Sequence, residues 1–218
     1  MTVILTVHRA TNQIGGNCIE IITAEGRRLI LDVGRPLDAP KEATGLLPKT
    51  LDLASPADGI LISHPHQDHY GLLDETPKTW PVYCGLATEK LIRLTSGIFG
   101  PPIERDFRSW KSGQAFAVGP FTVTPFLTDH SAFDSYMLLI EVENKRILYS
   151  GDFRLSIMTR SSFPTFLSSV PYTAVPSTLS LAIKETVSFD SRIVAVVIGL
   201  PFIASGSAHL RRNQTPHG

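Results

Sequence analysis

The chain has 218 residues, of which 43% are hydrophobic and 18% charged, so it can bury the core of one sizeable domain or two small ones. Its 20 lysines and arginines balance 20 acidic residues. This balance excludes a global positive field that would hold a nucleic-acid backbone and leaves only a local basic groove. The two cysteines lie outside any CxxC pair, which excludes a disulfide framework or zinc knuckle and predicts that Cys18 and Cys84 are small buried residues.

The chain contains no apolar run of the length that a membrane-spanning helix requires. The longest run, residues 193–204, is interrupted by Gly199 and Pro201, whereas a span needs about 20 apolar residues. Residues 1–7 are apolar but have no basic leader before them, so we expect a strand there rather than a signal peptide. We therefore expect a soluble cytoplasmic protein without a membrane partner.

The first predicted elements are the strands of a β-hairpin. Residues 17–22 and 29–33 are apolar and β-branched, and Gly26 between them can adopt the positive φ that a tight turn requires. Short buried strands are expected next at residues 59–63 and 81–84.

One helix is predicted in the middle of the chain, at residues 86–96, where apolar residues recur about every 3.6 positions. Two further pairs of strands are expected after it, 114–118 with 121–127 and 136–142 with 146–150. Strands interleaved with helical segments indicate a mixed α/β sandwich.

Four potential metal ligands lie within six positions, directly after a predicted buried strand: His64, His66, Asp68 and His69. Pro65 favours an extended conformation at His64, and in an extended chain residues two apart point to the same side. His64 and His66 can therefore converge on one cation. Imidazole nitrogens and carboxylates are the ligands that zinc and similar ions prefer, so this density of ligand-type residues indicates a metal site rather than packing.

Two further candidates stand at the ends of predicted strands. His130 follows the strand at 121–127, and Asp152 follows the strand at 146–150. Alone, each would be an ordinary polar loop residue, but functional side chains gather at strand ends and the nearby cluster favours such a role. A carboxylate such as Asp152 can bridge two cations about 3.5–4 Å apart. Asp68 is a candidate ligand that could also cap the helix expected to follow it.

The run at residues 64–69, His-Pro-His-Gln-Asp-His, resembles the HxHxDH signature of the metallo-β-lactamase superfamily. Residues 128–131 and 149–154 are similar to later ligand motifs of its ribonuclease J and β-CASP nucleases, and residues 15–20 to their first hairpin. The resemblance implies an α/β fold, the αββα four-layer sandwich, with its N-terminal part at residues 1–154 and its second half not identified in the sequence.

The resemblance also implies a role for each candidate residue. The expected metal ligands are His64, His66 and His130 on one ion, Asp68 and His69 on a second ion, and Asp152 as the bridge between them. Asp68 would also orient the attacking hydroxide as the catalytic residue. Asp32 would brace the metal loop through hydrogen bonds, although without the resemblance it is equally well explained as a turn residue after a strand. The expected cofactors are two divalent metal ions, zinc in the first place, since manganese and iron accept the same ligands.

The composition changes after residue 154. Residues 1–154 contain 18 acids, whereas residues 155–218 contain 2 and are rich in serine and proline. The segment 161–180 shows neither helical nor strand periodicity, so we expect no regular structure there. Within the tail, the apolar run at residues 193–200 is the segment whose pattern favours a buried strand.

The tail bears on whether the site is complete. The resemblance requires a final histidine on the second metal, for which His209 is a candidate and His217, at the chain end, a poorer one. Residues 155–218 either belong to the fold or reflect a truncated gene or a shifted reading frame. Translation of the encoding DNA in its other two frames beyond codon 154 would distinguish these hypotheses.

Two functions from different classes follow. The first is a metal-dependent hydrolase in which a metal-bridging hydroxide attacks a phosphodiester, such as RNA, or an ester. The second is a catalytically silent metal-binding fragment of such an enzyme, because the final ligand is not identified. A redox di-iron domain is a third, weaker interpretation, since such sites favour a carboxylate where His66 stands. Metal stoichiometry measured together with phosphodiester hydrolysis would separate the first two.

Overall fold

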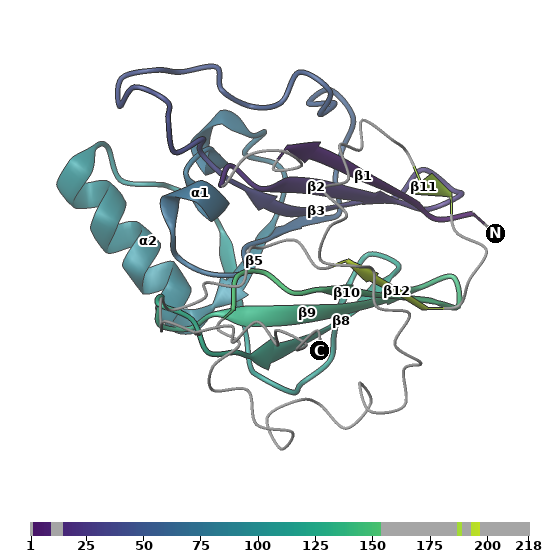
Figure 1. The fold of residues 1–218 in the computed structure, drawn as a ribbon. Coiled ribbons are helices and arrows are strands. Elements are labelled where there is room, and N and C mark those ends of the chain that lie inside the picture. Colours follow the sequence, from purple (N-terminus) through teal and green to yellow (C-terminus); the bar gives the residue numbers. More distant parts are fainter. Residues whose placement is uncertain (1, 10–14, 154–186, 189–192, 197–218) are drawn as a thin grey trace, which may run out of the picture.

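The computed structural model of the chain describes residues 2–9, 15–153, 187–188 and 193–196. Within these residues the strands form two sheets that lie one above the other (Figure 1). The larger sheet has seven strands, in the order β11 (Val187–Ser188), β1 (Ile4–Arg9), β2 (Cys18–Ile22), β3 (Arg28–Val33), β4 (Gly59–Leu61), β5 (Val82–Gly85) and β6 (Phe107–Trp110). The smaller sheet has five, in the order β12 (Ile193–Val196), β10 (Lys145–Tyr149), β9 (Tyr136–Val142), β8 (Phe121–Leu127) and β7 (Phe116–Val118).

The space between the two sheets is filled by one hydrophobic core. Alternate residues of each strand point into it, because successive side chains of a strand face opposite sides. The large sheet contributes Ile19, Ile21, Leu29, Leu31 and Leu61, and the small sheet contributes Phe121, Val123, Leu138, Ile140 and Ile147. Each fully buried side chain of this size stabilises the fold by about 1.5–3 kcal/mol.

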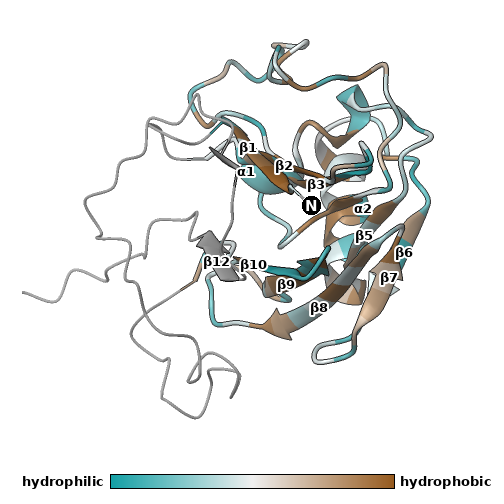
Figure 2. Ribbon diagram, turned by 90° about the vertical axis from the view of Figure 1, so that its right-hand side faces the viewer, coloured by the Kyte–Doolittle hydropathy of each residue, from teal (hydrophilic) through white to brown (hydrophobic). Residues whose placement is uncertain are grey.

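A second core lies on the outer face of the large sheet, beneath the helices α1 (Gln67–Tyr70), η1 (Leu73–Glu75) and α2 (Leu86–Phe99). Tyr70, Leu73 and Ile92 pack there from the three helices against residues such as Ile30 and Ile60. The central strands are therefore covered on both faces, and Figure 2 shows hydrophobic residues concentrated along β2, β3 and β5. The described residues form a helix layer and two sheet layers, which is the mixed α/β sandwich predicted from the sequence.

The strand directions bring the candidate residues to one edge of the sandwich. β3, β4 and β5 run parallel, so their carboxyl ends meet at the same edge of the large sheet. The loop with the histidine cluster leaves β4 at this edge. In the small sheet, β9 runs antiparallel to both β8 and β10, so the carboxyl ends of β8 and β10 also share an edge.

All three predicted strand pairs are confirmed, and β7 pairs antiparallel with β8 as expected of residues 114–118 and 121–127. β2 pairs with β3 around Gly26, whose φ is 76°, and β9 pairs with β10 around Glu143 and Asn144, whose φ values are 48° and 61°. Cys18 and Cys84 are buried and free, as expected. The predicted helix is also present, although it continues three residues beyond the predicted end.

Three details differ from the expectation. Asp68 does not cap a helix, because α1 begins at Gln67 with His66 as its N-cap and places Asp68 inside the first turn. The edge strand β6 was not predicted, because its central residues Arg108 and Ser109 are exposed and polar and interrupt any apolar run. The first strand is shifted from the predicted residues 1–7 to Ile4–Arg9.

The tail contributes two short strands to the described structure. β12 pairs with β10 in parallel and covers the first half of the predicted strand 193–200, while β11 pairs with β1. Segment 161–180 and the candidates His209 and His217 lie outside the described residues. No helix within the part of the chain that the structure describes is long and apolar enough to cross a membrane.

Candidate metal centre

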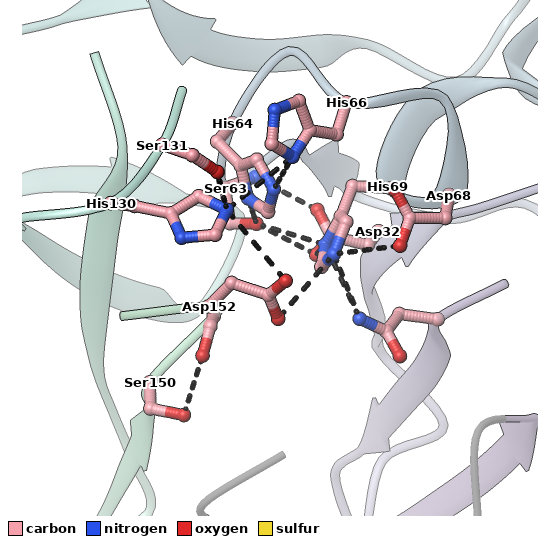
Figure 3. Close-up of polar contacts among 12 residues, drawn as sticks. Asp32, Ser63, His64, His66, Asp68, His69, His130, Ser131, Ser150 and Asp152 are labelled. Carbon is pink, nitrogen blue, oxygen red and sulfur yellow. Dashed lines mark hydrogen bonds and ion pairs between the residues drawn. The ribbon is translucent and has the colours of Figure 1, made fainter. Parts of the chain in front are cut away.

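Loops at the ends of three strands bring the candidate ligands together (Figure 3). His64, His66 and His69 follow β4, His130 follows β8, and Asp152 follows β10. The side chains that could share an ion form two overlapping groups, His64 with His66 and His130, and His64 with His69 and Asp152; within each group the ligand atoms lie within 4.8 Å of one another. The fold thus juxtaposes residues that are up to 88 positions apart, from His64 to Asp152.

The first group consists of three imidazoles whose nitrogens face one another. Nε2 of His64 lies 3.1 Å from Nδ1 of His66, and Nε2 of His130 lies 3.3 Å from the same atom. The rings of His64 and His66 are nearly perpendicular, at 77°, so they converge edge-on instead of stacking. Three converging ring nitrogens are the donor set that zinc and related cations prefer.

The second group combines the imidazoles of His64 and His69 with the Asp152 carboxylate, and the Asp68 carboxylate lies beside it. Nε2 of His69 lies 3.6 Å from Oδ1 of Asp152 and 3.8 Å from Oδ2 of Asp68. The His69 side chain is fully buried, whereas the side chains of Asp68 and Asp152 are 14% and 24% exposed to solvent. The ligand atoms of this group are therefore open to solvent on the carboxylate side only.

The two oxygens of Asp152 face different groups. Oδ1 lies toward His69, and Oδ2 lies 3.7 Å from Nε2 of His130, in the first group. Figure 3 shows the carboxylate between these two histidines. A carboxylate in this position can contact one cation with each oxygen, which is how two metal ions are bridged.

The electrostatics of the site favour cations. Burial and the neighbouring histidines lower the pKa of His64, so its imidazole is neutral and its lone pair is available. Burial would also lower the pKa of His69, but Asp32 and Asp152 outweigh it and raise this pKa to about 10. The carboxylates thus favour positive charge at this position, from a proton or from a metal ion. The residues present fit a pair of divalent cations.

Asp32 braces the centre from beneath. Its fully buried carboxylate accepts hydrogen bonds from the Ser63 backbone N–H and hydroxyl, both at 2.8 Å, and from Nδ1 of His69 at 2.6 Å. A carboxylate that accepts from Nδ1 orients the ring and leaves Nε2 free to bind an ion. This agrees with the bracing role expected of Asp32.

Three residues around the centre were not predicted from the sequence. Ser63 lies between Asp32 and the ring of His64, with its hydroxyl 3.0 Å from Nδ1 of that ring. The Asn17 side-chain amide lies 3.1 Å from Nε2 of His69, and the Tyr149 hydroxyl donates to Asp32. Their one signal in the sequence is position: Ser63 precedes the histidine run, Asn17 opens the first hairpin and Tyr149 stands three residues before Asp152.

Close backbone contacts hold the metal loop against the first hairpin. The Asn17 N–H donates to the carbonyl of Asp68 at 3.0 Å, and the Gly34 N–H donates to the carbonyl of Asn17 at 2.8 Å. A Cβ on Gly34 would overlap the backbone carbonyl of Asp68, so only glycine permits this approach. The hairpin therefore fixes the position of Asp68.

Comparison with known proteins agrees with this geometry. The sequence profile of the Beta-lactamase superfamily domain matches residues 27–163, which is more than half of the chain. The chain belongs to this family. The matched segment of this Beta-lactamase superfamily domain contains Asp32, the histidine run, His130 and Asp152.

Curated relatives of this superfamily domain place it near the ribonuclease J branch. The chain is 29% identical over 161 residues to an RNase J-like protein of Methanocaldococcus jannaschii, an alignment that covers 69% of this chain and 36% of that protein. It is 28% identical over 168 residues to a ribonuclease J of Helicobacter pylori, covering 71% of this chain and 24% of that protein. A ribonuclease Z of Bradyrhizobium diazoefficiens is 26% identical over 141 residues, covering 59% of this chain and 45% of the relative. The chain thus spans less than half the length of these relatives.

Solved structures confirm the fold of the superfamily domain. A protein of unknown function from Enterococcus faecalis superimposes with a TM-score of 0.64 at 22% identity, covering 78% of this chain and 48% of that structure. The metallo-β-lactamase-fold protein YhfI of Bacillus subtilis superimposes with a TM-score of 0.52 at 18% identity, covering 70% of this chain and 64% of that structure. The predicted metallo-β-lactamase fold is therefore correct.

Proposed function

We propose that the chain is a metal-dependent hydrolase that cleaves phosphodiesters, with RNA as the substrate class. His64, His66 and His130 would hold one divalent cation, Asp68 and His69 would hold the second, and Asp152 would contact both. The observation that carries the proposal is the Asp152 carboxylate, with one oxygen 3.6 Å from His69 and the other 3.7 Å from His130. RNA is proposed because the curated relatives are ribonucleases.

The ions, expected to be zinc, would lower the pKa of water toward about 7 and neutralise the charge that develops on the phosphate. Asp68 is suited to orient the attacking water, because its carboxylate lies beside His69 and is partly open to solvent. Its Oδ2 would accept a hydrogen bond from that water and hold it in line for attack. Burial of His64 and His69 keeps water away from the rear of the site, which strengthens each charge interaction inside it.

The proposal is tested with the full chain, stripped of metal by a chelator and reloaded with Zn²⁺ or Mn²⁺. We expect hydrolysis of bis(p-nitrophenyl) phosphate and of a single-stranded oligoribonucleotide, lost in the metal-free protein and in His66→Ala. Asp106→Asn is the control, because the Asp106 side chain is 80% exposed and its ion-pair partner is Arg108, outside the cluster of candidate ligands. Hydrolysis of p-nitrophenyl acetate alone would assign an ester substrate instead. One weakly held ion without turnover of any of these substrates would identify a silent metal-binding fragment.

A further inference from the structure

Tyr149 connects the small sheet to the candidate metal centre. It is the last residue of β10, and its side chain is fully buried in the core between the two sheets. Its hydroxyl donates a hydrogen bond to Oδ2 of Asp32, at 2.5 Å. A buried phenol hydroxyl needs such a partner, and here the partner is the carboxylate that braces His69.

The oxygen that Tyr149 contacts is shared. Oδ2 of Asp32 also accepts from the Ser63 hydroxyl at 2.8 Å and from Nδ1 of His69 at 2.6 Å. The Asp32 backbone adopts a φ of 54°, in the left-handed region that residues other than glycine rarely enter. Donors from Ser63, which follows β4, from His69 and from Tyr149 at the end of β10 together hold the carboxylate in place.

The same strand end also sets the position of the bridging carboxylate. Asp152 follows Tyr149 by three residues, through Gly151, whose φ is 53°. A Cβ on Gly151 would come within 3.2 Å of the Ser63 side chain, so the strand end passes close to the Asp32 network. A shift of β10 relative to the large sheet would therefore move Asp152 away from His69.

We infer that Tyr149 is a positioning residue of the metal centre. Its hydroxyl holds the Asp32 carboxylate against Nδ1 of His69 and ties the strand end that carries Asp152 to the large sheet. This role rests on the proposed function and extends it to a residue of the apolar core. The group that would depend on Tyr149 is the second one, built on His69 and Asp152. His64 also contacts this network, through the Ser63 hydroxyl at 3.0 Å and the His69 ring at 3.9 Å. The first group further contains His66, whose Nδ1 lies against the rings of His64 and His130 and not against Asp32.

The substitution Tyr149→Phe isolates the hydroxyl, because a phenyl ring fills the same space in the core. Tyr83→Phe is a matched control: Tyr83 lies in the same core, and its hydroxyl accepts a hydrogen bond from Arg108 at 2.9 Å, away from the centre. Zn²⁺ binding to the full-length, metal-free variants would be measured by competition with a chromophoric chelator. The absorption spectrum of the Co²⁺-loaded protein would report the coordination geometry of each bound ion.

We expect Tyr149→Phe to weaken the second equivalent of Zn²⁺ about 10-fold, the lower end for partners that orient a metal ligand, and to weaken the first by less. Its Co²⁺ spectrum should change most at the second equivalent, whereas Tyr83→Phe should match the wild type in both measurements. An unchanged isotherm for Tyr149→Phe, or equal weakening of both equivalents, would overturn the inference. Failure of the wild type to bind Zn²⁺ would overturn the proposed function as well.

A second variant covers the case in which Tyr149→Phe does not fold. Asp32→Asn keeps the shape of the acceptor but removes its charge, so it weakens the link to His69 from the other side. We expect the same selective loss of the second equivalent, by about 10–100-fold. Loss of the first equivalent alone would contradict the inference.

Discussion

Asp152 is the residue on which the proposed chemistry depends most, because each of its oxygens faces a different group of ligands. Asp152→Asn should lower kcat/KM for bis(p-nitrophenyl) phosphate by at least about 100-fold, since even partners that only orient ligands contribute about 10–100-fold. It should also reduce the zinc content of the purified protein, measured by atomic emission. Asp106→Asn is the control, because the Asp106 side chain is 80% exposed. Full turnover in Asp152→Asn would exclude the bridging role.

A buried charge network on β1, β2 and β3 makes a separate prediction about stability. Glu20 accepts hydrogen bonds from His8 at 3.1 Å and from Arg28 at 2.6 Å, and its side chain is 6% exposed. Burial would raise the pKa of Glu20, but the bonds from His8 and Arg28 outweigh it and hold the pKa below its usual value. The network therefore stabilises the folded state while Glu20 is ionised.

Glu20→Gln should destabilise the protein by about 3–5 kcal/mol at pH 7, because Arg28 would keep a buried charge without its partner. Because the folded-state pKa is lowered, the stabilisation is fully present above the ordinary pKa of about 4.3 and is lost as the pH falls through the folded value. Urea unfolding of the wild type and of Glu20→Gln at pH 7 and pH 4 measures the free energy of unfolding at each pH. The difference between wild type and variant should shrink at pH 4, and a larger difference there would contradict the account.

At the residue scale, the sequence predicts metal ligands where the spacing of the residues is itself the signal. His64 and His66 were predicted to share a cation because an extended backbone places their side chains on one side. The network around Asp32 could not be predicted, because Ser63 and Tyr149 are 31 and 117 positions away from it. Ser63 meets Asp32 only once β3 has paired with β4, and Tyr149 meets it only once the two sheets have packed. A lone Ser or Tyr in an apolar run carries no sign of such a partner.

At the element scale, the contact between the first hairpin and the metal loop depends on Gly34. Gly34→Ala should destabilise the protein by about 1–3 kcal/mol and weaken zinc binding, because the added methyl would push the Asp68 carbonyl away. Gly97→Ala is the control: a Cβ there meets nothing within 4 Å, and α2 should gain about 0.5–1 kcal/mol. Chemical denaturation measures both, and equal effects of the two substitutions would contradict the proposed contact.

The loop that carries His130 is attached to α2 by Asp134. Its carboxylate accepts from the Thr88 N–H and the Tyr136 hydroxyl, both at 2.7 Å, and so caps a helix that has no side-chain cap of its own. Asp134→Ala should cost about 1 kcal/mol of stability, the typical effect of removing an N-cap. It should also weaken the first equivalent of Zn²⁺ in the chelator competition. A fully stable variant would show that the cap contributes nothing.

The elements themselves were predictable where local signals agree. Hairpins β2–β3 and β9–β10 combine apolar runs with turn residues that adopt positive φ, and both were predicted close to their observed ends. Edge strand β6 was missed because it is stabilised by pairing with β5 and by the packing of Trp110, not by an apolar run. The start of α1 was misplaced because His66 serves as an N-cap without a capping side chain.

At the scale of the whole molecule, the two sheets and the helix layer were predicted from the order of elements and from the resemblance carried by the histidine run. The division into a domain at residues 1–154 and a tail at 155–218 stays a prediction. The family profile continues to residue 163, and strands β11 and β12 of the tail pair with β1 and β10. The final ligand of the second metal, for which His209 is proposed, also stays a prediction.

The central claim is that one chain holds two divalent cations, one on each group of ligands. The most direct test is the zinc stoichiometry of the full chain, measured by equilibrium dialysis of metal-free protein against increasing Zn²⁺ and read by atomic emission. We predict two equivalents per chain, reduced to one in Asp152→Asn and unchanged in Asp106→Asn. A wild-type plateau at one equivalent or none would contradict the account.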